Sequence, residues 1–142
     1  MKKVLVVNGP NLNMLGIREP GIYGTLTLEE INSMISNKAK ELDINVEFYQ
    51  SNIEGEIVNA IHSAYNKFDG LIINPGAYSH YSGAIYDALK AVGIPSVEVH
   101  ISNVFSREEH RQNMVTAKAS KGVISGFGAK SYILALEGLF DE

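Results

Sequence analysis

The chain has 142 residues, of which 45% are hydrophobic and 20% are charged, and its formal net charge at pH 7 is −4. This length is typical of one domain, so we expect a single domain over residues 1–142 with enough buried apolar surface to fold without disulfides. The negative charge and the absence of Cys argue against a nucleic-acid-binding protein, a disulfide-rich secreted domain and a thiol-dependent enzyme.

The first apolar run covers residues 4–7 and stops at Asn8. It is too short for a membrane span or for the apolar part of a signal peptide, and no other run approaches a span. We therefore expect a cytoplasmic protein with no membrane partner.

Short apolar runs alternate with amphipathic segments along the chain. In chain order, the pattern predicts a strand at 4–7, a helix at 27–42, a strand at 45–49, a helix at 54–67, a strand at 71–73, a helix at 80–92, a strand at 96–99, a short helix at 107–115, a strand at 122–124 and a helix at 128–140. Thr27 and Glu30 have the spacing of a capping box.

Buried strands that alternate with helices indicate a parallel sheet with right-handed crossovers and helices on both faces. At this length the expected fold is α/β, a flavodoxin-like doubly wound five-stranded parallel sheet of order 2-1-3-4-5. Ligands bind in such sheets beyond the carboxyl ends of the strands, where the strand order reverses. The candidate site therefore consists of the loops at residues 8–26, 74–80 and 99–106.

The first loop contains several Asn residues, together with Arg18 and Tyr23. Asn amides can orient a polar ligand or a water molecule. A cation within about 4–6 Å favours a phenolate and can make Tyr23 a useful base. The alternative is a surface loop with a solvated Arg and a packed Tyr ring.

The second and third loops add titratable groups. Asn74 and His80 precede the N-terminus of a helix that contains Asp87, a position that favours anions. The alternative is that Ser79 caps this helix and that His80 has only structural hydrogen bonds. Glu98 and His100 are two residues apart, so in a strand they share a face. A His after a buried strand is a candidate acid or base, and the alternative is a His bonded to a backbone carbonyl.

Other ligand classes lack support in the sequence. The four His residues do not have zinc-type spacing, so we expect no metal. The segment 125–131 resembles a phosphate loop but lacks its required glycines. A receiver domain needs acidic residues where Asn8 and Asn74 stand, and an FMN carrier needs a hydroxyl-rich first loop.

Several long motifs resemble those of the type II 3-dehydroquinate dehydratases. They are NGPNLNMLGIREPGIYG at 8–24, INPGAYSHYS at 73–82, VEVHISN at 97–103, REEHR at 107–111 and VISGFGAKSYILAL at 123–136. The resemblance covers nearly the whole chain. It implies a flavodoxin-like lyase of the shikimate pathway that converts 3-dehydroquinate to 3-dehydroshikimate by anti elimination through an enolate, without metal or cofactor, and that assembles as a dodecamer of four trimers.

The resemblance also implies residue roles. Tyr23 is the expected base, activated by Arg18, and His100 is the expected general acid, held by Glu98. Asn11 is expected to position a water that stabilises the enolate. The expected substrate-hydroxyl contacts are Asn74, His80, Asp87 and Arg111, and the backbone of Ile101 and Ser102 is the expected carboxylate site.

Two features depart from the family pattern. Tyr81 and Tyr86 stand where many members have a small residue and an arginine, and residues 112–121 match poorly. Two alternatives to the proposed mechanism remain: a homologue that binds a similar ligand without turnover, and the same reaction through a Schiff-base lysine.

Overall fold

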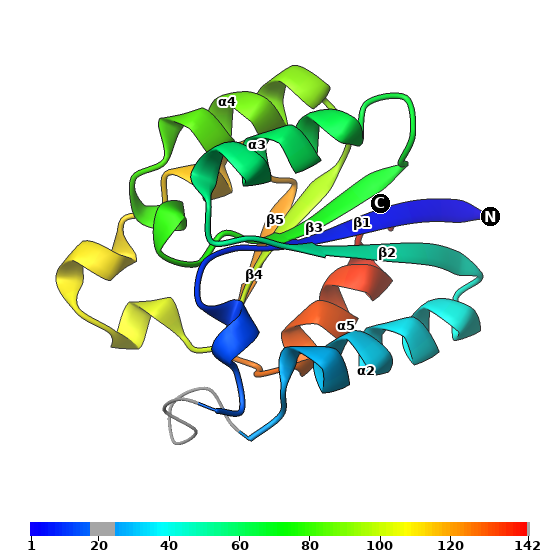
Figure 1. The fold of residues 1–142 in the computed structure, drawn as a ribbon, viewed down its shortest axis with the longest axis horizontal. Helices are drawn as coiled ribbons and strands as arrows, with labels where there is room; N and C mark the ends of the chain where they lie inside the picture. Colours follow the sequence, from blue (N-terminus) through cyan, green and yellow to red (C-terminus); the bar gives the residue numbers. More distant parts are fainter. Residues whose placement is uncertain (18–24, 142) are drawn as a thin grey trace.

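A five-stranded parallel sheet forms the centre of the protein (Figure 1), and its strand order is β2-β1-β3-β4-β5. The structure is a computed structural model that describes residues 1–17 and 25–141. The strands are β1 (Lys2–Asn8), β2 (Ile44–Gln50), β3 (Gly70–Asn74), β4 (Ser96–His100) and β5 (Gly122–Ser125). The expected fold and strand order are confirmed.

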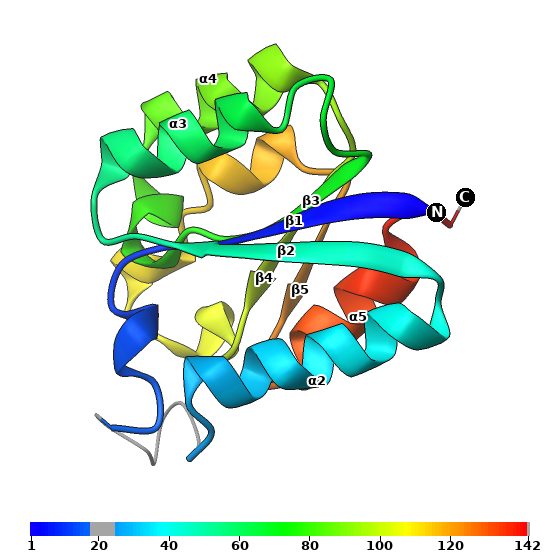
Figure 2. The same cartoon turned by 45° about the vertical axis from the view of Figure 1, so that its right-hand side comes forward.

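Two layers of helices cover the sheet (Figure 2). The layers are formed by α2 (Leu28–Glu41) and α5 (Lys130–Gly138) on one face and by α3 (Glu54–Ser63) and α4 (Gly83–Val92) on the other. Successive β1 side chains alternate between the two cores, since Val4 and Val6 pack in one core while Leu5 and Val7 pack in the other. This explains why β1 is apolar without interruption. No helix within the described ranges is long and apolar enough to cross a membrane.

Local capping explains where two of the helices begin. The capping box predicted at Thr27 and Glu30 is present at the start of α2, and its hydrogen bonds hold the pKa of the Glu30 carboxyl below its ordinary value. The helix predicted at 80–92 begins instead at Gly83. The Ser82 hydroxyl accepts a hydrogen bond from the Ile85 N–H at 3.0 Å, so Ser82 is the cap and Ser79 is not.

The prediction of a helix at 107–115 is wrong. That stretch contains the 3-10 turn η4 (Glu109–Gln112) and continues in an extended conformation at Asn113. The Val115 N–H donates to Ser79 O at 2.8 Å, and the Asn113 carbonyl lies 2.9 Å from the His80 ring. These contacts with the second loop hold the segment in a shape that a helix cannot adopt.

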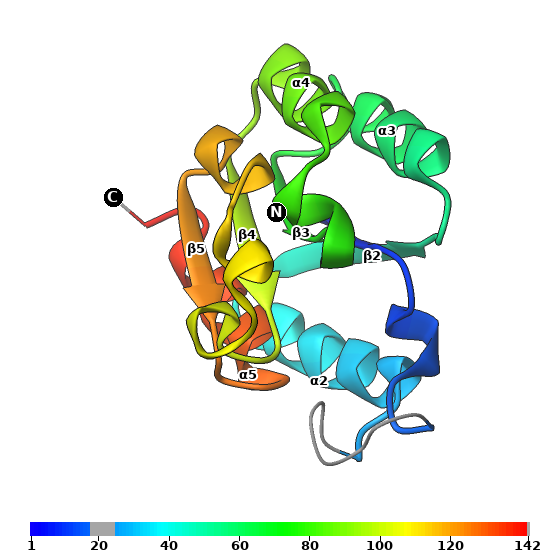
Figure 3. The same ribbon diagram turned by 90° about the vertical axis from the view of Figure 1, so that its left-hand side faces the viewer.

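The loops after β1 and β3 leave the sheet side by side (Figure 3). The register pairs Asn8 with Asn74, and the Gly9 N–H donates to Asn74 O at 2.8 Å. A Cβ atom on Gly9 would lie 2.7 Å from Pro75 O. Glycine is therefore required at position 9 because the two backbones approach too closely for a side chain.

Tyr132 of α5 bridges the ends of β1 and β3 through two hydrogen bonds. Its fully buried hydroxyl donates to Asn8 Oδ1 at 2.5 Å and accepts from Asn74 Nδ2 at 3.0 Å. Burial raises the pKa of the Tyr132 phenol well above its ordinary value, so the hydroxyl keeps its proton. One phenolic proton thus sets the direction of both hydrogen bonds and fixes the orientation of both amides.

We expect Gly9→Ala to lower the free energy of unfolding by about 1–3 kcal/mol, because the added methyl group must displace backbone atoms. Gly55→Ala in α3 is the matched control, since a Cβ there meets nothing within 4 Å, and we expect it to be neutral or to stabilise by about 0.5–1 kcal/mol. Chemical denaturation followed by circular dichroism measures both variants. Equal effects of the two substitutions would contradict the close approach at Gly9.

We expect Tyr132→Phe to lower the free energy of unfolding by about 1–3 kcal/mol, because two buried amide groups lose their common partner. Tyr65→Phe is the control, since the Tyr65 side chain is 61% exposed, and its effect should stay within about 0.5 kcal/mol. The same denaturation experiment separates them. A Tyr132→Phe protein as stable as the Tyr65→Phe protein would show that the hydroxyl does not hold the two strand ends.

Candidate active site

A pocket of about 400 Å³ opens beyond the carboxyl ends of β1, β3 and β4, where the strand order predicts a ligand site. Its walls come from all three predicted loops and from the segment that follows the third. The predicted site residues that line it are Asn11, Asn74, His80, His100, Ile101, Ser102 and Arg111. The volume is in the range of pockets for small molecules.

Other predicted residues lie elsewhere. Arg18 and Tyr23 lie outside the described residues. Glu98 lies behind the pocket wall, where it is fully buried. Asp87 is exposed on α4 and is not among the residues that line the pocket within this chain.

The first loop is held by residues at and just beyond the end of β2. Asn11 has a left-handed backbone with φ 70°, a conformation that Asn tolerates better than most residues. Its N–H donates to Asn52 Oδ1 at 2.9 Å, and Gln50 Nε2 donates to Gly9 O at 3.1 Å. These contacts place Asn11 on the pocket wall.

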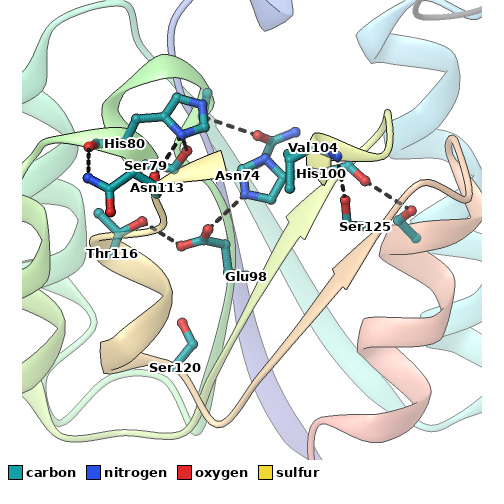
Figure 4. Close-up of polar contacts among 12 residues, drawn as sticks. Asn74, Ser79, His80, Glu98, His100, Val104, Asn113, Thr116, Ser120 and Ser125 are labelled. Carbon is teal, nitrogen blue, oxygen red and sulfur yellow. Dashed lines mark hydrogen bonds and ion pairs between the residues drawn. The ribbon is translucent and has the colours of Figure 1, made fainter. Parts of the chain in front are cut away.

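The second loop presents Asn74 and His80 (Figure 4). Asn74 Oδ1 accepts from the Gly76 N–H at 3.1 Å, in addition to the Tyr132 contact. The His80 Nδ1 lies 2.9 Å from Asn113 O, and burial, as the largest cause, lowers the pKa of His80 below its ordinary value. His80 is therefore neutral at pH 7, with its proton on Nδ1 and an acceptor lone pair on Nε2.

Glu98 and His100 form a buried pair at the end of β4 (Figure 4). Glu98 Oε2 lies 2.7 Å from His100 Nε2, as the spacing of two residues in a strand predicts. The second carboxylate oxygen, Oε1, accepts a hydrogen bond from the Thr116 hydroxyl at 2.5 Å. Sequence analysis missed Thr116, because it lies in the stretch at 112–121 where no motif was recognised.

The backbone after His100 is turned by the segment at 125–131. The backbone carbonyls of residues 100–102 all accept hydrogen bonds from the segment at 125–131. His100 O accepts from Gly126 N at 3.1 Å and from Ser131 Oγ at 3.3 Å. Ile101 O accepts from Gly128 N at 3.0 Å, and Ser102 O accepts from Ser125 Oγ at 3.1 Å. In a trans peptide the N–H points opposite to the preceding carbonyl. The amides of Ile101 and Ser102 therefore point away from this segment.

Basic side chains stand along the outer wall. Arg107 and Arg111 line the pocket together with His80 and His100. The Arg111 Nε lies 2.8 Å from Glu108 Oε2 without hydrogen-bond geometry at that nitrogen, so the contact is ionic. Glu108 accepts a hydrogen bond from its own backbone, which is the largest cause that lowers the pKa of its carboxyl, and the Arg111 charge adds to it. This wall favours an anionic ligand.

Metal ligands are not gathered in the described part of the chain, where no three His, Asp or Glu side chains form a group that can hold an ion. The polar groups of the pocket are mainly amides, imidazoles and guanidinium groups, together with the Ser102 hydroxyl and the Glu108 carboxylate that is paired with Arg111. Such groups are suited to a small polyhydroxylated anion, because they donate and accept hydrogen bonds in fixed directions.

Comparisons with known proteins identify the family of this chain. The sequence model of the family described as "Dehydroquinase class II" matches residues 2–140. A 3-dehydroquinate dehydratase of Caldicellulosiruptor bescii is 63% identical over 140 residues, covering 98% of this chain and 97% of that protein. One from Clostridium acetobutylicum is 56% identical over 137 residues, covering 96% of this chain and 95% of that protein.

Solved structures give the same result. The type II dehydroquinase of Butyrivibrio crossotus matches with a TM-score of 0.95 at 53% identity, covering 97% of both chains. A 3-dehydroquinate dehydratase-like protein of Bifidobacterium longum matches with a TM-score of 0.73 at 32% identity, covering 98% of this chain and 95% of that one. With its fold and nearly its whole length in common with these proteins, the chain belongs to the class II dehydroquinase family.

Proposed function

We propose that this chain is a 3-dehydroquinate dehydratase that eliminates water from 3-dehydroquinate to give 3-dehydroshikimate in the shikimate pathway. Family membership over the whole chain supports this reaction. The observation that carries the proposal is the buried Glu98–His100 pair at the wall of a pocket lined by amides and basic groups. That pair provides a proton donor next to hydrogen-bonding groups for a polyhydroxylated acid.

His100 is the proposed general acid. The Glu98 carboxylate accepts from Nε2–H, so Nδ1 is the ring nitrogen that can transfer a proton to the departing hydroxyl group. Protonation at Nδ1 makes an imidazolium, and the adjacent carboxylate stabilises its charge. The hydroxyl group then leaves as water.

Tyr23 is the proposed base and Arg18 its activating cation, on the resemblance of the motif at 8–24 to the family. The tyrosinate takes the proton next to the ketone, and the electron pair of that C–H bond forms an enolate. A water held by Asn11 is proposed to donate to the enolate oxygen, since such developing charge requires preorganised donors. Collapse of the enolate expels the hydroxyl group that His100 protonates.

The remaining groups are proposed to bind the substrate. The amides of Ile101 and Ser102 point away from the supporting segment and are available to hold the carboxylate. Asn74, His80 and Arg111 are proposed to bind the ring hydroxyls, for which the neutral His80 offers an acceptor. Asp87 keeps its proposed hydroxyl contact from the family resemblance, although it does not reach the pocket of its own chain.

The family resemblance supports the other parts of the proposal. We propose a single catalytic domain that works in the cytoplasm, without metal or cofactor, in a dodecamer of four trimers. A Schiff-base mechanism has less support, because none of the described pocket residues is a lysine.

Purified protein mixed with 3-dehydroquinate in the presence of EDTA should produce a rising ultraviolet absorbance from the conjugated enone product. Borohydride added during turnover should leave the protein unmodified, because no imine forms. A flat trace from folded protein would favour a homologue that binds without turnover, and covalent labelling would overturn the proposed mechanism in favour of a lysine.

Tyr23→Phe and His100→Ala should each reduce kcat by about 10²–10⁴-fold, the typical contribution of a general base or acid. Tyr65→Phe and His62→Ala are the matched controls, because both side chains are exposed, and they should keep wild-type kcat. Binding of a substrate analogue by Tyr23→Phe, measured by calorimetry, separates loss of chemistry from loss of folding. Wild-type turnover in either variant would remove that residue from its role.

A further inference from the structure

The Glu98 carboxyl group lies in the protein interior. Glu98 and Thr116 are both 0% exposed. Within the described part of the chain, the hydrogen-bond partners of this carboxylate are Thr116 on Oε1 and His100 on Oε2. A buried carboxylate without enough donors takes up a proton instead of remaining charged. Thr116 is therefore one of the two described residues that form hydrogen bonds with this carboxyl group.

We propose that Thr116 is a positioning residue for the dehydration reaction, whose hydroxyl keeps the Glu98 carboxylate ionised so that the exchangeable proton stays on His100. The inference rests on the proposed role of His100 as the general acid. The pair has two ways to hold one proton: carboxylate with imidazolium, or carboxylic acid with neutral imidazole. Only the first can protonate a leaving hydroxyl group.

The hydroxyl of Thr116 selects between these two states. A charge-assisted hydrogen bond is stronger than one to a neutral acceptor, so donation to Oε1 stabilises the carboxylate state more than the carboxylic acid state. Removal of the hydroxyl shifts the proton from His100 to Glu98 without moving either residue. The proportion of the active state falls, and the ligand contacts in the pocket stay unchanged.

The position of Thr116 separates this role from substrate binding. Thr116 begins the 3-10 turn η5 (Thr116–Ala119), follows Val115, which is bonded to Ser79 O, and does not line the pocket. Its side-chain hydrogen bond is to Glu98, so we expect it to act on His100 through that carboxylate. A purely structural role for a buried Thr predicts loss of stability without a change in where the proton lies.

The test compares Thr116→Val, which keeps the shape, with Thr116→Ser, which keeps the hydroxyl. Thr116→Val should lower kcat about ten- to a hundredfold with little change in KM, and Thr116→Ser should recover most of the lost rate. Ser96→Ala is the matched control, because it also removes a buried hydroxyl. The Ser96 hydroxyl lies in β4 and contacts Ser120 at 3.3 Å instead of Glu98. This variant should keep wild-type kcat.

Nitrogen-15 NMR of labelled histidine reports the proton directly. The His100 ring, assigned by its loss in His100→Asn, should show less imidazolium character in Thr116→Val and wild-type character in Thr116→Ser. If Thr116→Val does not fold, Thr116→Val and Thr116→Ser are compared in a Glu98→Gln background. No carboxylate is present at position 98 there, so Thr116→Val should fold and should lower kcat no further.

The outcomes are distinct. Wild-type kcat and an unchanged His100 spectrum in Thr116→Val would overturn the positioning role, as would a further loss of kcat in the Glu98→Gln background. Wild-type turnover in His100→Asn would overturn the general-acid role instead, and the His100 spectrum would still show whether Thr116 controls the proton.

Discussion

The close approach of the backbones at Gly9 and Pro75 is the constraint on which the pocket depends. Because β1 lies between β2 and β3, its loop and the β3 loop must separate at the same level of the sheet. The Gly9 N–H bond to Asn74 O ties them before they part. Gly76, with φ 60°, then turns the second loop away from the first, at a point where its backbone packs closely against Pro10. The pocket exists because two neighbouring loops are joined at their bases and diverge above.

The groups that line this pocket are each held from outside it. Asn74 is oriented by Tyr132, His80 by Asn113 and His100 by Glu98. The backbone after β4 is turned by the glycine-containing segment at 125–131, where Gly126 has φ 99° and lies against Asn103. Groups that are fixed before a ligand arrives need little reorganisation when it binds or reacts. The segment that looks like an imperfect phosphate loop in the sequence therefore supports the backbone of the proposed carboxylate site.

The parts of this arrangement that depend on neighbouring residues could be predicted from the sequence. Buried strands, the capping box at Thr27 and the shared face of Glu98 and His100 are such features, and their geometry follows from local periodicity. Contacts between distant residues could not be predicted. The Tyr132–Asn74 bond joins residues 58 apart, and the Thr116–Glu98 bond joins residues 18 apart. The prediction of a helix at 107–115 failed for the same reason, because contacts with the second loop determine the conformation of that segment.

The distribution of charge explains how an acidic protein can have a basic pocket wall. The chain has a net charge of −4, yet Arg107 and Arg111 stand in the pocket wall, and the acidic Glu108 there is paired with Arg111. Glu98 is fully buried and lies behind His100, so its charge acts first on the imidazole and only weakly on a ligand. An unpaired carboxylate in the pocket wall would repel an anionic ligand, whereas Glu108 is paired with Arg111 and Glu98 lies behind the imidazole. The buried position of Glu98 thus allows the proposed general acid and the proposed anion-binding groups to share one small pocket.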